Sequence, residues 1–315
     1  MDISVTRIAK AYEQIDSVFK NSPQFISDAL GAVLGKRVLL KVEVVNPIRS
    51  FKGRGSSFLL RQFKDGQHLV CPSAGNFGQA LAYCAASTGV RLTVVAPETA
   101  NPLKVEAMRR LGAKVLLQGH DFDEAKKQAL SLAQREDVYF VEDGKDLSIA
   151  EGAGTIGLEL LRANKNLDAV FVPVGNGSLI CGIAAWIKAH SPNTRVIGVC
   201  PVGAPSMALS FHEDRIVNTE TADTIADGLA VRIPVPEAVA FMRNFVDDVV
   251  LVSDDNMIEA MRLAFQYLGL ALEPSGAAGL AGIMTTASSL VNAETVATVL
   301  CGGNVRSEHL KYLGS

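Results

Sequence analysis

The chain has 315 residues, of which 48% are hydrophobic and 20% are charged, and its formal net charge is -3. This length suffices for one large domain or two ordinary ones, and we expect two lobes, each with its own core. The small negative charge disfavours binding to nucleic acids, and no apolar run reaches the roughly 18 residues that cross a membrane, so we expect a cytoplasmic protein.

The cysteines are scattered along the chain and contain no C-x-x-C pair. There are five cysteines, and an odd number argues against a disulfide framework. We expect most of them to be small buried hydrophobic residues. They are Cys71, Cys84, Cys181, Cys200 and Cys301.

The N-terminal part of the chain predicts two helices and a strand before a glycine-rich stretch. The first helix carries apolar residues at helical spacing, namely Ile8, Tyr12, Ile15 and Phe19. A second short helix is predicted over Phe25–Leu30, and the alternating pattern of Arg37–Val45 predicts a strand. Lys52 then lies where a loop opens a helix that continues over Ser56–Phe63.

From residue 68 the pattern of strand, turn and helix repeats, which is typical of parallel strands with crossover helices in an open α/β sheet. The predicted strands are His68–Cys71, Arg91–Ala96, Lys114–Leu117, Val138–Val141, Ala169–Val174, Arg195–Cys200 and Thr295–Leu300. The predicted helices are Gln79–Ser87, Pro102–Leu111, Phe122–Arg135, Glu151–Ala163, Leu179–His190, Asp254–Leu268 and Gly276–Ala287. Residues 201–236 are rich in glycine, proline and polar residues, and we expect them to wrap the surface.

The stretch Ser50–Gly55, S-F-K-G-R-G, places one lysine among glycine, serine and aromatic residues. A lysine amine becomes nucleophilic when burial or a nearby cation lowers its pKa, and Arg54 is two residues from Lys52. Lys52 is therefore a candidate covalent anchor, as a Schiff base, for pyridoxal phosphate. A solvated surface lysine is the alternative.

A glycine-containing turn follows the apolar strand that ends at Val174, and it consists of Gly175, Asn176, Gly177, Ser178 and Leu179. Such a turn at the start of a helix presents backbone N–H groups to a phosphate, although an ordinary tight turn has the same composition. The turn lacks the lysine of a P-loop, and Ile180 stands where a dinucleotide turn has its third glycine. A single phosphate fits it better.

Two further stretches follow strands. In Ser73–Asn76 the Ser73 hydroxyl, the backbone amides and the Asn76 side chain are donors for a carboxylate, although both residues are also favoured helix caps. Cys301 places a neutral sulfur at the carboxyl edge of a sheet, where open α/β folds bind ligands. A buried structural cysteine is the alternative.

Together these stretches resemble the serine/threonine dehydratases, which are pyridoxal-phosphate enzymes of fold type II. The matching stretches, in the order of that family, are Ser50–Gly55, Ser73–Gly78, Gly175–Leu179, Ile225–Val231, Glu273–Gly279 and Cys301–Asn304. The resemblance covers most of the chain. It implies two open, mostly parallel twisted sheets with helices on both faces, and a cofactor in the cleft between a large lobe (1–63 and 144–315) and a small lobe (64–143).

The resemblance also implies roles for individual residues. Lys52 is similar to the Schiff-base lysine, Phe51 to a residue that packs on the cofactor ring, and Asn76 to the donor to its phenolic oxygen. The amides of Gly175–Leu179 resemble the phosphate loop, and Cys301 the group that faces the pyridine nitrogen. The substrate site is expected at Ser73, Ala74, Gly75, Asn76 and Phe77, and the assembly is expected to be a homodimer.

Several residues depart from the family pattern. Asn176 and Ser178 replace glycines of the phosphate loop, and Phe77 stands where many members have histidine. Cys200 precedes Pro201 where several relatives have a glutamate that helps to hold a cation, so we expect no metal site. We expect no regulatory domain after residue 315, and hence no allosteric control of the kind seen in the longer biosynthetic enzymes.

The expected reaction converts L-threonine, L-serine or an aryl-serine to a 2-oxo acid and ammonia, with Lys52 as the general base for the α-proton. A neutral Cys301 thiol leaves the pyridine ring a weak electron sink, which favours elimination over transamination. The alternatives are serine racemisation, β-replacement as in cysteine synthase, threonine synthase chemistry, or a non-catalytic or nucleotide-binding α/β protein.

The residue at position 74, an alanine, indicates whether elimination or racemisation is the expected reaction. A racemase needs a second acid–base group on the face of the α-carbon opposite the lysine. Racemases that resemble this chain have a serine in the position of Ala74, and a methyl group cannot exchange a proton. We therefore expect a lyase.

Overall fold

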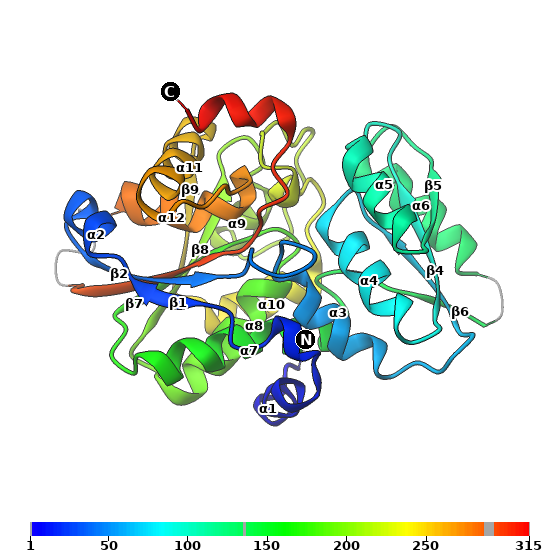
Figure 1. Ribbon diagram of the computed structural model, residues 1–315, viewed down its shortest axis with the longest axis horizontal. Coiled ribbons are helices and arrows are strands. Elements are labelled where there is room, and N and C mark those ends of the chain that lie inside the picture. The colour runs from blue at the N-terminus through cyan, green and yellow to red at the C-terminus, as the bar shows by residue number, and fades with distance from the viewer. Residues whose placement is uncertain (1, 135–136, 287–292, 315) are drawn as a thin grey trace.

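The computed structural model describes residues 2–134, 137–286 and 293–314. The predicted helix ends at Arg135 and Ala287 lie outside these residues. Two separate sheets organise the chain, and Figure 1 shows the larger sheet on the left and the smaller on the right.

The larger sheet has the strand order β1-β2-β10-β7-β8-β9, and every neighbouring pair is parallel except β1 with β2. Its strands are β1 (Gln24–Ile26), β2 (Arg37–Val42), β10 (Thr295–Leu300), β7 (Ala169–Pro173), β8 (Arg195–Pro201) and β9 (Asp248–Val252). The smaller sheet is fully parallel, with the order β5-β4-β3-β6. Its strands are β5 (Lys114–Leu117), β4 (Arg91–Ala96), β3 (His68–Pro72) and β6 (Val138–Phe140).

Helices cover both faces of each sheet, which confirms the predicted fold class. The helices are α1 (Val5–Gln14), α2 (Asp28–Leu34), α3 (Lys52–Leu60), α4 (Asn76–Ala86), α5 (Pro102–Arg110), α6 (Phe122–Leu132), α7 (Leu147–Ala163), α8 (Ser178–His190), α9 (Ser206–His212), α10 (Pro236–Phe245), α11 (Asp254–Leu268) and α12 (Pro274–Thr286). Short 3-10 helices occupy Ser17–Phe19, Asp227–Leu229 and Ser307–Tyr312.

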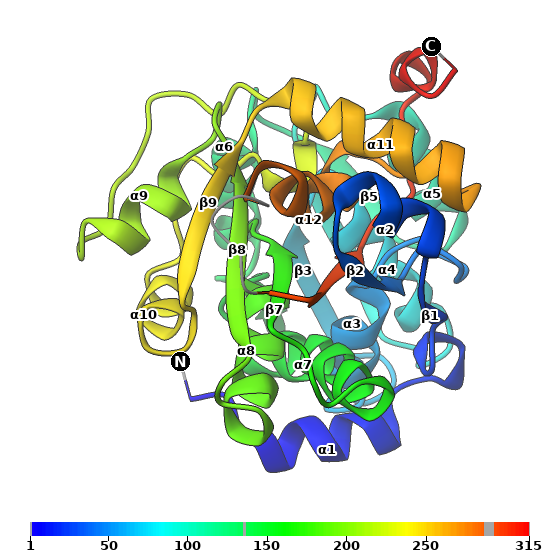
Figure 2. The ribbon, with the colours of Figure 1, turned by 90° about the vertical axis from the view of Figure 1, so that its left-hand side faces the viewer.

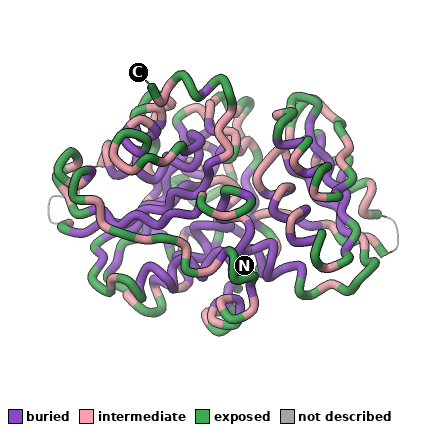
Figure 3. Tube along the Cα trace, viewed as in Figure 1, coloured by how far each residue is buried: buried purple, intermediate pink, exposed green. Residues whose placement is uncertain are grey.

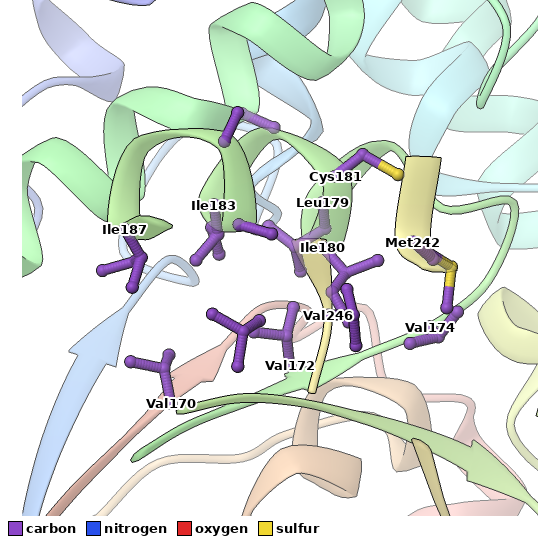
Figure 4. Close-up of a cluster of buried hydrophobic side chains, with 14 of the residues drawn as sticks. Val170, Val172, Val174, Leu179, Ile180, Cys181, Ile183, Ile187, Met242 and Val246 are labelled. Carbon is purple, nitrogen blue, oxygen red and sulfur yellow. The ribbon is translucent and has the colours of Figure 1, made fainter. Parts of the chain in front are cut away.

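The larger sheet separates two hydrophobic cores because successive side chains of a strand point to opposite faces. Val170 and Val172 of β7 pack under α8, with Ile180 and Ile183 above them (Figure 4). Phe171, between the two valines, belongs to the core under α11 and α12 on the other face. In Figure 2 these helices lie on one side of the sheet, and α7 and α8 lie on the other.

The smaller sheet is built in the same way. Leu69 and Cys71 of β3 belong to a core that includes residues of α4 and α5, whereas Val70 packs with Ala125 and Ala129 of α6. The buried segments of Figure 3 follow the strands of both sheets and the inner faces of their helices. Within the described residues, no helix has both the length and the apolar character needed to cross a membrane.

Two predictions for the peripheral segments are wrong. The predicted helix Phe25–Leu30 is instead strand β1, which pairs with β2, followed by α2, whose N-cap is Ser27. Its apolar spacing fits both structures, and only the partner strand decides between them. Residues 201–236 do not merely wrap the surface, because they contain α9 and bury Ala226 and Leu229. Helix α10 and strand β9 were not predicted.

Candidate active site

A cavity of about 570 Å³ is lined by residues that come from both sheets. Segments that follow the carboxyl ends of β3, β7 and β10 meet there, as expected for ligand sites in open parallel sheets. Every residue that the sequence proposed for the site lines this cavity. These residues are Phe51, Lys52, Ser73, Ala74, Gly75, Asn76, Phe77, Gly175, Asn176, Gly177, Ser178, Leu179 and Cys301.

Lys52 is the first residue of α3, so the prediction that it lies where a loop opens a helix is confirmed. Its Nζ lies 2.6 Å from Oδ2 of Asp143 and 3.3 Å from Oγ of Ser178. The ring centres of Phe51 and Phe77 are 4.6 Å and 5.8 Å from this amine. The amine therefore lies close to two aromatic rings, with one carboxylate and one hydroxyl in reach.

Arg54 does not face Lys52 as a free cation. Its guanidinium is fully buried, and its nitrogens lie 2.8 Å from carboxylate oxygens of Glu43 and of Glu159. Two carboxylates thus lie against its charge, and these contacts hold α3 against α7 and the segment that follows β2.

The turn between β7 and α8 carries the predicted phosphate-binding amides. Gly177 is the N-cap residue of α8 with a φ of 97°, a left-handed conformation that favours glycine. The first amides of a helix have no intrahelical acceptor, and the helix dipole adds positive potential there. This end of α8 is therefore suited to an anion, and Ser178 also contacts Lys52.

The loop between β3 and α4 is held by Ser73. Its Oγ accepts hydrogen bonds from the backbone N–H groups of Gly75, at 3.2 Å, and Gly78, at 2.8 Å. The N-cap residue of α4 is Gly75, so neither Ser73 nor Asn76 is the N-cap that the sequence offered as the alternative. Ser73 instead holds the loop through these two amides, while its hydroxyl hydrogen is still available to a ligand.

Asn76 connects three segments of the chain. Its Nδ2 donates to Oε1 of Glu273, and its Oδ1 accepts from Nδ2 of Asn304 at 2.9 Å. These contacts fix which end of the amide carries the donor. Nδ2 is therefore a preoriented donor at the cavity wall.

Cys301 follows β10, and its side chain is buried with Sγ 3.5 Å from the carbonyl oxygen of Ser275, to which it donates. Burial, aided by the nearby Glu273 carboxylate, raises the pKa of the thiol to about 12. Cys301 therefore presents a protonated, uncharged sulfur to the cavity at neutral pH.

Among the charged lining residues that the sequence did not predict as site residues, four form one cluster. Nζ of Lys104 lies 2.9 Å from Oδ2 of Asp227 and 3.4 Å from Oε2 of Glu273, and Arg306 lies 3.2 Å from the same Asp227 oxygen. Burial opposes the charged form of Lys104, but the two carboxylates outweigh it and raise the lysine's pKa. Burial also raises the pKa of Glu273.

The sequence held a partial signal for these residues. Asp227 and Glu273 lie within two of the stretches that matched the dehydratase pattern, whereas Lys104 lies inside an ordinary amphipathic helix and Arg306 follows the last matching stretch. Only the fold brings them together. Among the described residues, no group of three or more His, Cys, Asp or Glu side chains is arranged to hold a metal ion.

Comparison with known proteins identifies relatives over nearly the whole chain. Residues 15–302 match the family model described as pyridoxal-phosphate dependent enzyme. The chain is 32% identical to the L-threonine ammonia-lyase of Thermotoga maritima, over 96% of this chain and 76% of that protein. It is 34% identical to the biosynthetic L-threonine dehydratase of Pasteurella multocida, over 89% of this chain.

The structure is similar to that of maize serine racemase, with a TM-score of 0.92 and 28% sequence identity, over 99% of this chain and 96% of the other. The match to the Pasteurella dehydratase covers only 55% of that protein, and the chain spans about half the length of several curated relatives.

Proposed function

The chain belongs to the family of pyridoxal-phosphate dependent enzymes, and from this we propose that it is an ammonia-lyase acting on a β-hydroxy-α-amino acid. The products are a 2-oxo acid and ammonia. The observation that carries the proposal is the position of Lys52, whose amine faces a cavity that also holds an anion-binding helix end, a loop of amide donors and a neutral thiol.

The donor set of the cavity fits pyridoxal phosphate. The N-terminus of α8 suits its phosphate, Asn76 Nδ2 its phenolic oxygen, Cys301 its pyridine nitrogen, and Phe51 its ring face. Bound there, the cofactor would supply the aldehyde that condenses with the substrate amine and the ring that takes up electron density from the α-carbon.

Lys52 is the proposed catalytic base. Its Nζ takes the α-proton, and its contacts with Asp143 and Ser178 hold the amine in place before reaction. Loss of the β-hydroxyl as water gives an enamine, which tautomerises to an imine, and hydrolysis of the imine releases the 2-oxo acid and ammonia.

The loop Ser73–Phe77 is the proposed binding site for the substrate carboxylate. Its backbone amides and the Ser73 hydroxyl donate to carboxylate oxygens, and Ala74 and Gly75 leave the backbone accessible. Cys301 would present an uncharged thiol to the pyridine nitrogen, and without a full charge there the ring would withdraw electrons weakly, which favours loss of the β-hydroxyl.

We further propose that residues 1–63 and 144–315 form the large lobe and residues 64–143 the small lobe, and that the protein is a cytoplasmic homodimer. All strands of the smaller sheet fall within 64–143, which supports the division. Light scattering on the purified protein tests the dimer, and fractionation of the source cells tests the location.

The function is tested with the purified protein loaded with pyridoxal phosphate. We expect release of 2-oxo acid and ammonia in equal amounts from at least one β-hydroxy-α-amino acid among L-threonine, L-serine and phenylserine. The Lys52→Ala variant should lose turnover by about 10²–10⁴-fold or more, and borohydride should no longer trap the cofactor on the Lys52 peptide. Lys64→Ala, an exposed lysine after α3, is the control. Wild-type turnover by Lys52→Ala would refute the assignment.

A further inference from the structure

Part of the cavity wall is apolar. Phe77 lies at the start of α4, Phe122 is the first residue of α6, and Leu229, Val231 and Ile233 lie on the segment before α10. Ile233 is 44% exposed, and Phe122 and Val231 are half-buried. Because burying exposed apolar surface lowers the free energy, this wall favours an apolar group on the ligand.

Ion pairs hold two of these segments together. Arg232, between Val231 and Ile233, lies 3.1 Å from Asp121 and 2.8 Å from Asp123, the two neighbours of Phe122. The start of α6 and the segment 229–233 therefore meet beside the cavity, and their apolar side chains line the same cavity.

The charged side chains of the cavity disfavour a negatively charged substituent. Each lysine and arginine among the described lining residues is already paired with a carboxylate. The pairs are Lys52–Asp143, Lys104–Asp227, Lys126–Glu142, Arg232–Asp123 and Arg306–Asp227. An anionic group on the substrate's β-carbon would have to break one of these pairs.

Phe77 is the apolar lining residue that lies close to the proposed base. Its ring centre is 5.8 Å from Nζ of Lys52, the amine that takes the α-proton in the proposed reaction. The β-carbon is bonded to the α-carbon, so its substituent lies within reach of this ring. Two phenylalanines in the wall favour an aromatic substituent in particular, since aromatic pairs gain about 0.5–1.5 kcal/mol beyond their buried area.

We propose, building on the function above, that this cavity selects aryl-serines, β-hydroxy-α-amino acids with an aromatic ring on the β-carbon, over L-serine and L-threonine. The loop Ser73–Asn76 holds the carboxylate, and Phe77, Phe122, Val231 and Ile233 surround the ring.

The first test compares kcat/KM of the pyridoxal-phosphate-loaded enzyme for L-threo-phenylserine, L-threonine and L-serine. We expect the value for phenylserine to be at least about tenfold the highest of the other two. A higher value for L-threonine or L-serine would overturn the inference and leave the proposed lyase function intact.

Substitutions of apolar lining residues test whether this wall sets the substrate selectivity. Phe122→Ser should lower the ratio of kcat/KM for phenylserine to that for L-threonine by about tenfold. Phe265→Ser is the matched control, because Phe265 is 44% exposed on α11 and is not among the lining residues. Val231→Ser provides a second probe if Phe122→Ser does not fold. An unchanged ratio in a folded variant would overturn the role of the wall.

A binding measurement separates this inference from the proposed function. L-Phenylalanine and L-alanine lack the leaving hydroxyl, and their dissociation constants for the loaded enzyme are obtained by calorimetry. If L-phenylalanine binds at least about tenfold more tightly than L-alanine, the result supports the aromatic site even if no substrate is turned over. Equal affinities would overturn it.

Discussion

At the scale of single residues, the proposed site depends on a few side chains whose partners fix their orientation. Asn76 is held between Glu273 and Asn304, so its donor end is defined before any ligand binds. Lys52 contacts Asp143 and Ser178, which come from two other segments of the chain. Preoriented groups of this kind spend little free energy on reorganisation during a reaction.

Ala74 decides between elimination and racemisation in our proposal. It lines the cavity beside Ser73, and its methyl group has no exchangeable proton. The wild type should therefore release ammonia from L-serine or L-threonine without accumulating the D-isomer. The Ala74→Ser variant should gain measurable racemisation. Chiral chromatography of the remaining amino acid measures it. Ala100→Ser, also at the cavity, is the control. D-Serine accumulating faster than 2-oxo acid in the wild type would contradict the proposal.

At the scale of elements, helix α3 is held from two sides. A Cβ on Gly55 would lie 2.5 Å from the carbonyl oxygen of Ile149, so only glycine allows α3 to approach α7 this closely. On the side of β2, a buried cluster surrounds Arg54. In this cluster Glu43 and Glu159 bind Arg54, and Lys41 lies 2.5 Å from Glu159. The helix that begins with Lys52 is therefore fixed to the larger sheet.

The Arg54 cluster predicts a large effect on stability. Arg54→Met leaves the buried carboxylates of Glu43 and Glu159 with less compensation, and removing one partner from a buried ion pair costs about 3–5 kcal/mol. Urea unfolding of the variant should show this loss in the free energy of unfolding. Arg61→Met, an exposed residue at the end of the same helix, should change it little. Equal stabilities of the two variants would argue against the cluster's role.

The same cluster predicts a dependence of stability on pH. Burial opposes ionisation of Glu159, but hydrogen bonds from Arg54 and the charges of Arg54 and Lys41 hold its pKa below the ordinary value of 4.5. A carboxyl with a lowered folded-state pKa stabilises the protein above its unfolded pKa, and this contribution is lost as the pH falls through the folded pKa. The difference in free energy of unfolding between wild type and Glu159→Gln should therefore shrink as the pH falls below this ordinary value.

The control for this pH series is Glu106→Gln, since Glu106 is 52% exposed and its ion pair with Arg110 lies on the surface. Its difference from wild type should stay small at every pH. If the difference in free energy of unfolding between wild type and Glu159→Gln grows on acidification, the proposed role of Glu159 is contradicted.

At the scale of the whole molecule, polar contacts join the two sheets across the cavity. Lys104 on α5, which packs on the smaller sheet, reaches Asp227 and Glu273 beside the larger one, and Asn76 on α4 reaches the same Glu273. The cavity therefore depends on contacts between segments that are far apart in the sequence.

The Lys104→Met variant tests this connection. It leaves the buried Glu273 carboxylate without its lysine, and we expect hydrogen exchange of backbone amides at the starts of α4 and α12 to rise by about tenfold or more. Lys114→Met, at the exposed start of β5, is the control. The same exchange rates in both variants would show that Lys104 does not hold these segments together.

The sequence by itself determined most of the strands, because their short apolar runs between turn residues have few other interpretations, and it placed Lys52 at a helix start. It also predicted residues after strands that line the cavity, since the carboxyl ends of parallel strands meet at one edge of a sheet. Only the tertiary structure decided that Phe25 lies in a strand, because that outcome depends on pairing with β2. It likewise decided that Arg54 faces two carboxylates, and that Lys104, Asp227, Glu273 and Arg306 share one cavity wall. Charges on distant segments become neighbours only when the chain folds, and no local pattern records those contacts.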